Sequence, residues 1–282
     1  MAAATRYRAA ALVLLLSGFL QAGAAQARPR PLWELGLGVG AVNFNDYPGA
    51  ASSHVYVVPV PYLRYRGRFL RADRDGARGV LLERSWLTVN VSAGAAVPVR
   101  SRDDAARSGM PNLAATVEIG PALDFHLWRS AAGNMAVDLR VPARLALTVG
   151  SRPRSLGWFM APNLNLDIRH PAGLQGWNLG LLAGPLYATR RYNDYYYSVA
   201  PRYVAPGRPA YQADGGYAGA AAVVALSRRF PRCWVGAFLR YQRLDGAVYA
   251  DSPLVHRHDY LAAGVGVAWV LGHSAHQVEA DD

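Results

Sequence analysis

The apolar residues of this chain alternate with small or polar residues, and past residue 27 they never form a run long enough to cross a bilayer as a helix. The longest such run, 218–226, has nine residues and is mostly Ala and Gly, whereas a transmembrane helix needs about 20. Alternation with a period of two places successive side chains on opposite faces of a β-strand. The sequence therefore predicts an all-β protein.

Two segments show the alternation most clearly. In 260–271, bulky side chains such as Val265 and Trp269 occupy every second position, and the opposite face is mostly Ala and Gly. In 113–127, large apolar residues alternate with polar ones such as Glu118. A soluble β-sandwich and an outer-membrane β-barrel both produce this pattern, so alternation alone does not separate them.

Three further features favour a single antiparallel transmembrane β-barrel over residues 28–271. Aromatic residues gather near the predicted strand ends, as in interfacial girdles, and short connections alternate with long ones, as periplasmic turns do with surface loops. Charged residues also occur in mid-strand, where a wet or salt-bridged lumen tolerates them and a dry core does not. These candidate lumen charges are Glu118, Asp124, Asp138, Arg140, Arg144, Asp167 and Arg169.

We predict twelve strands, and an even number places both termini in the periplasm. The predicted strands are 32–43, 55–65, 67–72, 79–83, 85–98, 112–128, 134–149, 156–169, 176–190, 216–228, 233–243 and 259–271. The long connections are 44–54, 99–111, 191–215 and 244–258.

Both ends of the chain differ from the predicted barrel. Arg6 and Arg8 precede an apolar stretch, and Ala25-Gln26-Ala27 forms a small-x-small cleavage site, so residues 1–27 are predicted to be a signal peptide. The stretch is too short for a membrane anchor. Residues 272–282 form a polar C-terminal tail, which we expect to be a disordered periplasmic extension.

The connection 191–215 is rich in Tyr, Pro, Gly and Arg and is predicted to be the largest surface loop. It is expected either to be a mobile loop that folds over the barrel mouth or to bind a glycan or partner, because Tyr and Arg make good contact anchors. The candidate surface-loop contacts are Tyr195, Tyr196, Tyr197, Arg202 and Tyr203.

The formal net charge is +11, and every Lys-or-Arg position is Arg. A basic balance often indicates nucleic acid, but an exported protein rarely meets it, so we exclude nucleic acid and expect anionic lipid headgroups of the outer membrane, or glycan phosphates at a cell surface, as partners. Cys233 is the only cysteine, which rules out a disulfide within the chain and a Cys-based metal cluster.

No sequence pattern predicts catalysis, a cofactor or a metal site. Gly36-x-Gly38-x-Gly40 has a strict spacing of two and is better interpreted as the small face of a strand than as a nucleotide loop. The segment 256–259 offers two histidines and an aspartate but no further ligands. His126 and Asp124 share a strand face without an associated Ser, which favours a lumen hydrogen-bond network over a lipid-processing triad. We therefore predict that the protein is not an enzyme.

Several segments, in order along the chain, resemble the MipA/OmpV family of outer-membrane proteins, named for a protein that interacts with a lytic transglycosylase. The matching segments are 35–41 with 46–49, 59–67, 104–113 with 118–121, 252–255 and 259–269. The resemblance implies an outer-membrane barrel without known catalytic residues. Family members usually end at or just after the last strand, whereas eleven residues follow Leu271 here.

The resemblance also implies a scaffold that links a murein hydrolase, the lytic transglycosylase, to a peptidoglycan synthase at the outer membrane. Three alternatives remain open. The mid-strand charges suggest a passive small-solute channel, and the 191–215 loop suggests a surface adhesin. A lipid-modifying enzyme is the least favoured.

Overall fold

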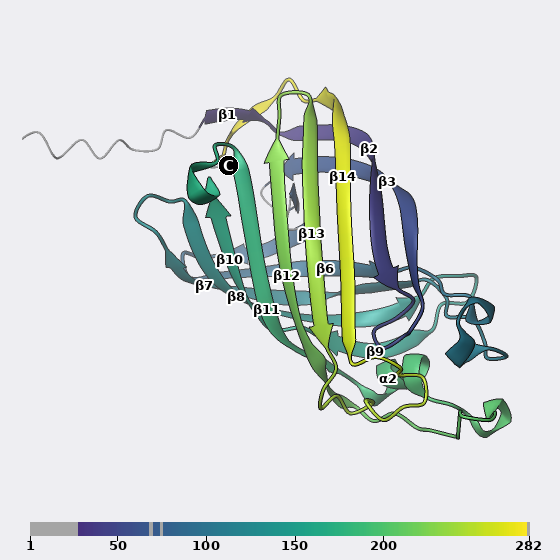
Figure 1. Ribbon diagram of the computed structural model, residues 1–282. Coiled ribbons are helices and arrows are strands. Elements are labelled where there is room, and N and C mark those ends of the chain that lie inside the picture. The colour runs from purple at the N-terminus through teal and green to yellow at the C-terminus, as the bar shows by residue number, and fades with distance from the viewer. Residues whose placement is uncertain (1–27, 68–69, 74–75, 281–282) are drawn as a thin grey trace, which may run out of the picture.

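The computed structural model describes residues 28–67, 70–73 and 76–280, and nearly all of its regular structure is antiparallel β-sheet (Figure 1). The predicted signal peptide, 1–27, lies outside the described residues. The main sheet consists of β2 (Trp33–Asn45), β3 (Ser53–Arg66), β4 (Leu70–Asp73), β5 (Gly76–Glu83), β6 (Leu87–Ala96), β7 (Thr116–Arg129), β8 (Met135–Thr148), β9 (Ser155–Met160), β10 (Asn163–Arg169), β11 (Trp177–Ala188), β12 (Gly216–Arg229), β13 (Cys233–Arg243) and β14 (Asp259–His273).

The sheet closes on itself into a barrel. Apart from β9 and β10, which do not pair with each other, each strand pairs with its neighbours in the chain. β14 pairs with β2, and β8 and β11 each pair with both β9 and β10. β9 and β10 therefore share one position in the wall, which gives twelve strand positions and confirms the predicted fold class. The predicted strand 156–169 is interrupted next to Pro162, which lacks a backbone N–H to donate to the ladder.

The alternation predicted from sequence separates the two surfaces of the wall. Bulky side chains face outwards and are widely exposed, as in Val57 at 74%, Val265 at 62% and Leu37 at 53%. Their neighbours on the inner face are small and buried, as in Ala262 at 4% and Ala268 at 0%. An apolar band around the outside of a closed barrel is the surface that contacts lipid in outer-membrane proteins.

A second, two-stranded sheet joins the first and last described segments of the chain outside the barrel wall. β1 (Arg28–Pro31) pairs antiparallel with β15 (Gln277–Ala280), and Figure 1 shows this ribbon at the end of the barrel that carries the short turns. The expectation of a disordered tail over 272–282 was therefore wrong for 277–280, and β14 itself continues to His273. Residues 28–31, which we assigned to the barrel, belong to this ribbon instead.

The two ends of the barrel differ in how their strands are connected. Turns such as 130–134 and 230–232 join strands at the β1–β15 end, and long loops join them at the other. The loop after β11 contains a two-turn helix, α2 (Arg190–Tyr197), at the far end in Figure 1. Of the helices in the described parts of the chain, none combines the length and apolar character that a bilayer-spanning helix needs.

Candidate functional site

The inner wall of the barrel has a polar half, formed by β6, β7, β8 and β10. Side chains that alternate with exposed Leu and Val point into the lumen here, and all seven predicted lumen charges lie on these strands. Arg140 of β8 lies 3.5 Å from Asp167 of β10, and Asn165 donates to Asp167 at 2.8 Å. Arg169 ends β10 and pairs in the ladder with Asn178 of β11.

Glu118 of β7 and Arg144 of β8 form a second polar group nearer the long loops. Their charged atoms lie 3.9 Å apart, and Arg144 Nε donates to Ser92 Oγ of β6 at 3.0 Å. Glu118 also accepts a hydrogen bond from the Tyr192 hydroxyl of α2 at 3.0 Å. The loop helix is thereby tied to the lumen wall.

A third group resembles a catalytic triad, because a carboxylate, an imidazole and a hydroxyl lie in sequence within hydrogen-bonding distance of one another. His126 Nδ1 lies 2.8 Å from Asp138 Oδ1, and His126 Nε2 lies 3.0 Å from Thr88 Oγ1. Thr88 is only 6% exposed, which leaves its hydroxyl little room for a substrate, and Arg129 also contacts Asp138 at 3.3 Å. This geometry favours the lumen network that we predicted around His126, with Asp138 as its carboxylate. Asp124 instead accepts from Asn90 at 2.7 Å.

The most buried ion cluster of the described lumen, around Glu34, was not predicted from the sequence. Glu34 of β2 is 6% exposed and binds Arg66 of β3 at 3.1 Å and Arg229 of β12 at 2.9 Å. The Tyr62 hydroxyl donates to the same carboxylate at 3.3 Å. The alternation would have placed Glu34 on the inner face beside Gly36, but its partner Arg229 is 195 residues away in sequence.

The other half of the lumen is apolar and borders a cavity of about 510 Å³. Its large side chains lie over glycines: a Cβ at Gly236 would meet the Trp234 ring at 2.3 Å, and one at Gly264 would meet the Phe238 ring at 2.5 Å. The inner glycines therefore make room for aromatic rings to lie against the wall. The apolar side chains that line the cavity include Val42, Val58, Val60, Leu182, Val223, Ala225, Trp234 and Phe238.

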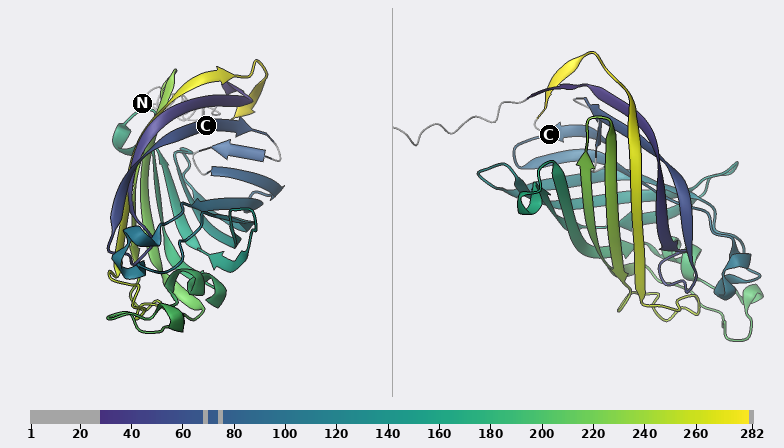
Figure 2. Two further views of the ribbon diagram at one scale, coloured as in Figure 1. Left: turned by 90° about the vertical axis from the view of Figure 1, so that its right-hand side faces the viewer. Right: turned by 45° about the horizontal axis from the view of Figure 1, so that its top comes forward.

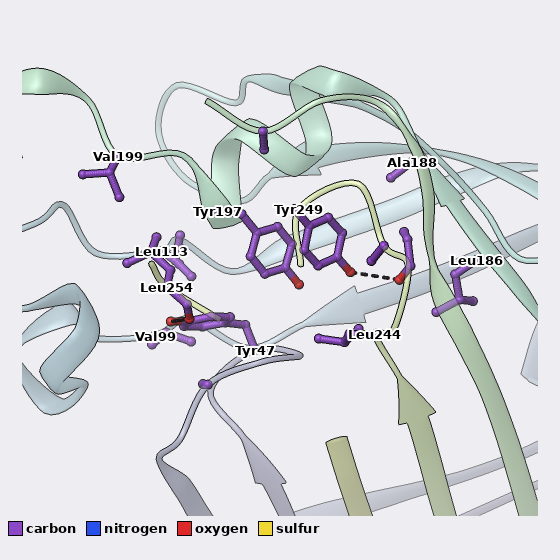
Figure 3. Packing of buried hydrophobic residues seen from close by; sticks show 14 of the residues in the cluster. Tyr47, Val99, Leu113, Leu186, Ala188, Tyr197, Val199, Leu244, Tyr249 and Leu254 are labelled. Carbon is purple, nitrogen blue, oxygen red and sulfur yellow. Dashed lines mark hydrogen bonds between the residues drawn. The ribbon is translucent and has the colours of Figure 1, made fainter. Parts of the chain in front are cut away.

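Four long loops pack together into a cap at the mouth of the barrel (Figure 3). The Tyr197 ring of α2 stacks on the Tyr249 ring with centroids 3.7 Å apart and planes 7° apart, and it meets Tyr47 edge-on at 6.0 Å. The Tyr47 hydroxyl donates to the carbonyl of Leu254 at 2.9 Å. Three loops thus share one aromatic core, and Val99 and Leu113 bring the fourth loop to it.

Burial changes the acid–base properties of these tyrosines, because removing a phenolate from water disfavours the charged form. Burial raises the pKa of Tyr249 to about 12. Burial first, and then the nearby Asp104 carboxylate, raises the pKa of Tyr47 well above its usual value. Burial likewise raises the pKa of Tyr197. The cap therefore holds its tyrosines in the neutral form.

The structure separates the five candidate contacts of the 191–215 loop. Tyr197 is 3% exposed and lies inside the cap, so it is not available to a partner in this conformation. Tyr195 and Tyr196 are half-buried, and the Tyr195 hydroxyl accepts from the backbone N–H of Ala114 at 2.7 Å. Arg202 is exposed beside the half-buried Tyr203. Of the five, Arg202 is the one that is fully exposed, and Tyr195, Tyr196 and Tyr203 are each partly exposed.

The histidine-containing segment 256–259 shows no gathering of ligands. His258 Nδ1 lies 3.1 Å from Asp245, an exposed carboxylate that also pairs with Arg243. Within the described residues, no group of three or more His, Cys, Asp or Glu side chains is arranged to hold a metal ion.

The sequence matches one family model over most of its length. The model, described as MltA-interacting protein MipA, matches residues 37–271. A comparison with curated proteins finds no match.

Solved structures similar to this chain are outer-membrane proteins at low identity. Outer membrane phospholipase A from Escherichia coli is 12% identical, with 86% of this chain and 94% of that chain covered and a TM-score of 0.34. The outer membrane protein OprG from Pseudomonas aeruginosa is 11% identical, with coverage of 86% and 94% and a TM-score of 0.25. The P. putida toluene transporter TodX is 12% identical, with coverage of 89% and 69% and a TM-score of 0.25.

Proposed function

The chain belongs to the MipA family of outer-membrane β-barrel proteins, and from that premise we propose that it is a scaffold that holds peptidoglycan-remodelling enzymes at the outer membrane. The proposed partners are a lytic transglycosylase and a peptidoglycan synthase. The family match is the observation that carries this proposal. We also propose that residues 1–27 are removed as a signal peptide during export.

The end of the barrel with short turns is the periplasmic end in proteins of this architecture, and its construction supports a docking role. The β1–β15 ribbon brings residues 28–31 and 277–280 together there and is anchored to the wall. Trp33 N donates to Ser274 Oγ at 3.3 Å, and Arg66 Nη1 donates to the carbonyl of Pro31 at 2.6 Å. An anchored ribbon presents a fixed surface to a partner, which lowers the entropy cost of binding.

Exposed arginines surround the same end of the barrel. They lie in the ribbon, in the short turns and at the end of β7: Arg30, Arg84, Arg129 and Arg232. Arginine keeps its charge at any physiological pH and binds carboxylates in a planar fork. We expect these side chains to meet an acidic surface on the periplasmic partner, where complementary charge speeds association and selects the partner.

The experiment is a binding measurement between the detergent-solubilised barrel and a purified lytic transglycosylase from the same cells. The test variant carries Arg30→Glu, Arg84→Glu and Arg232→Glu. The matched control carries the same three changes at exposed arginines of the long-loop end: Arg152, Arg202 and Arg257. We expect the test variant to lose most of its affinity and the control to keep it. Absence of binding by the unmodified barrel would remove the proposal.

We further propose that the protein has no lipid-modifying activity, because the triad-like arrangement around His126 has a nearly buried threonine as its hydroxyl. Lipid A and phospholipid profiles are expected to be the same in a deletion strain and in its parent. A change that Thr88→Val reproduces would contradict this.

A further inference from the structure

The barrel wall is interrupted between β3 and β6. β3 pairs with β4 only at Tyr65 and Arg66, and among the described residues its segment 53–64 has ladder partners only in β2. β6 pairs with β5 no further than Val91, so 92–96 pair only with β7. β4 and β5, the short blue arrows in the left view of Figure 2, have four and eight residues and fill only the periplasmic part of this wall.

The sequence of β3 keeps this edge open. Pro59 and Pro61 lie in the unpartnered segment, and proline, which has no N–H, is confined to edge strands and bulges. Two prolines therefore disfavour the addition of another strand here. The side chains around the opening are apolar and exposed: Val55 at 68%, Val57 at 74% and Val97 at 47%.

The apolar cavity lies directly behind this edge. Val58 and Val60, on the inner face of the unpartnered part of β3, line the cavity together with Trp234 and Phe238. Phe238 points into the lumen and is still 40% exposed, so its ring is available to a ligand. A volume of about 510 Å³ with mostly apolar walls is typical of small-molecule sites.

The cavity also has a polar pole. Arg140, Asp167, Asn165 and Asn178 line its far side, on β8, β10 and β11. Arg140 and Asp167 pair with each other, so the pole offers hydrogen bonds without a large net charge. An occupant with an apolar body and one uncharged polar group matches both parts of the wall.

The cap makes a route through the mouth unfavourable. Tyr47, Tyr197 and Tyr249 are each 3% exposed or less, and entry from that end would break their packing. The opening beside β3 instead faces the region where the outer apolar band meets lipid. An apolar molecule dissolved in the membrane reaches it without crossing water.

We propose that the apolar half of the lumen binds a single-chain molecule with an uncharged polar head, such as a medium-chain alcohol, and that this molecule enters sideways from the membrane between β3 and β6. The inference is independent of the scaffold role, since it uses the lumen and the wall rather than the periplasmic end.

The experiment uses a photoreactive medium-chain alcohol that carries a diazirine, added to the full mature chain in lipid nanodiscs. Labelled residues are identified by peptide mass spectrometry. Outward residues, such as Val224, report simple solution in the membrane, and the inward neighbour Val223 reports entry. We expect labelling at Val223 and Phe238, competed by unlabelled alcohol, and labelling at Val58 and Val60 along the route.

Two variants separate occupancy from folding. Ala225→Trp fills the cavity and is expected to lose most of the inward labelling. Ala222→Trp adds the same ring on the exposed outer face of the same strand and should leave it unchanged. Faster gel migration before boiling than after it checks that each barrel has folded.

Labelling of outward residues alone, with inward positions unlabelled in the folded wild type, would overturn the binding site. Labelling at Phe238 with none at Val58 or Val60 would overturn the sideways route. Neither outcome bears on transglycosylase binding, so a negative labelling result would leave the proposed scaffold role intact, and the loss of the scaffold role would leave this site intact.

Discussion

The hydroxyl of Tyr192, in the first turn of the loop helix α2, donates a 3.0 Å hydrogen bond to Glu118 Oε1 on the polar lumen wall, near the long-loop end of β7. Glu118 in turn contacts Arg144. The cap at the barrel mouth and the ion network of the lumen are therefore one connected structure, and changes in either are expected to reach the other.

Replacing Tyr197 by Ala should loosen the cap without unfolding the barrel. The ring is 3% exposed and stacks on Tyr249, and truncating a buried aromatic residue costs about 3–5 kcal/mol. We expect rapid proteolysis within 191–215 in detergent, with unchanged heat-modifiable gel mobility. The control is Tyr203→Ala, at a half-buried site outside the stack. In this variant the protease is expected to cut the 191–215 loop only slowly.

Alkaline pH should open the cap before it unfolds the barrel. Burial raises the pKa of Tyr249 to about 12, above the value of about 10 for an exposed tyrosine. The folded cap holds this proton more tightly than the open one, so its contribution is complete below about pH 10 and is lost as the pH rises towards about 12. Tyrosinate absorbance measured alongside loop proteolysis tests this. Titration of all sixteen tyrosines near pH 10 would contradict it.

Replacing Glu34 by Ala should weaken the barrel more than removing an exposed ion pair. The change leaves Arg66 and Arg229 facing each other without their shared carboxylate, and breaking a buried pair costs about 3–5 kcal/mol. Urea unfolding followed by gel mobility measures this change in stability. Asp245→Ala, in an exposed pair with Arg243, should leave the midpoint unchanged. Equal midpoints in both variants would show that the buried cluster adds nothing.

Hydrogen exchange should identify β3 as an edge strand. Within 53–64, amides that do not bond to β2 are expected to exchange quickly, while those of β13, paired on both sides, stay protected. Mass spectrometry with overlapping peptides resolves the two strands. Uniform protection along β3 would mean that its free edge is covered, and the sideways opening would be lost with it.

Removing the loop segment 191–213 and joining its ends with a short Gly-Ser linker should raise ion conductance in planar bilayers. The segment holds all of α2 except Arg190, and half of the aromatic stack that covers the mouth. The unmodified protein is expected to conduct weakly. Unchanged conductance after the deletion would contradict the prediction and would mean that ions are blocked at another level of the lumen.

Much of the fold could be predicted from local order in the sequence. Alternation assigned Leu37, Val57 and Val265 to the outer face, and turn residues located most strand ends. The tail was mispredicted because polar composition indicates disorder only when no partner strand is near, and the partner, 28–31, lies at the other end of the chain. The burial of Tyr197 was missed for a similar reason, since the rings packed on it, Tyr47 and Tyr249, come from two other loops.

The sequence by itself determined the period of two, and with it which side chains face lipid and which face the lumen, because strand geometry places successive residues on opposite sides whatever their partners are. Only the tertiary structure decided which inward groups meet. Glu34 and Arg229 come together because β14 closes onto β2, and contacts across a lumen depend on the circumference and stagger of the whole barrel. The opening beside β3 also depends on the tertiary structure. Pro59 and Pro61 are compatible with an edge strand, and β3 becomes one because the β4–β5 hairpin is too short to pair along its whole length.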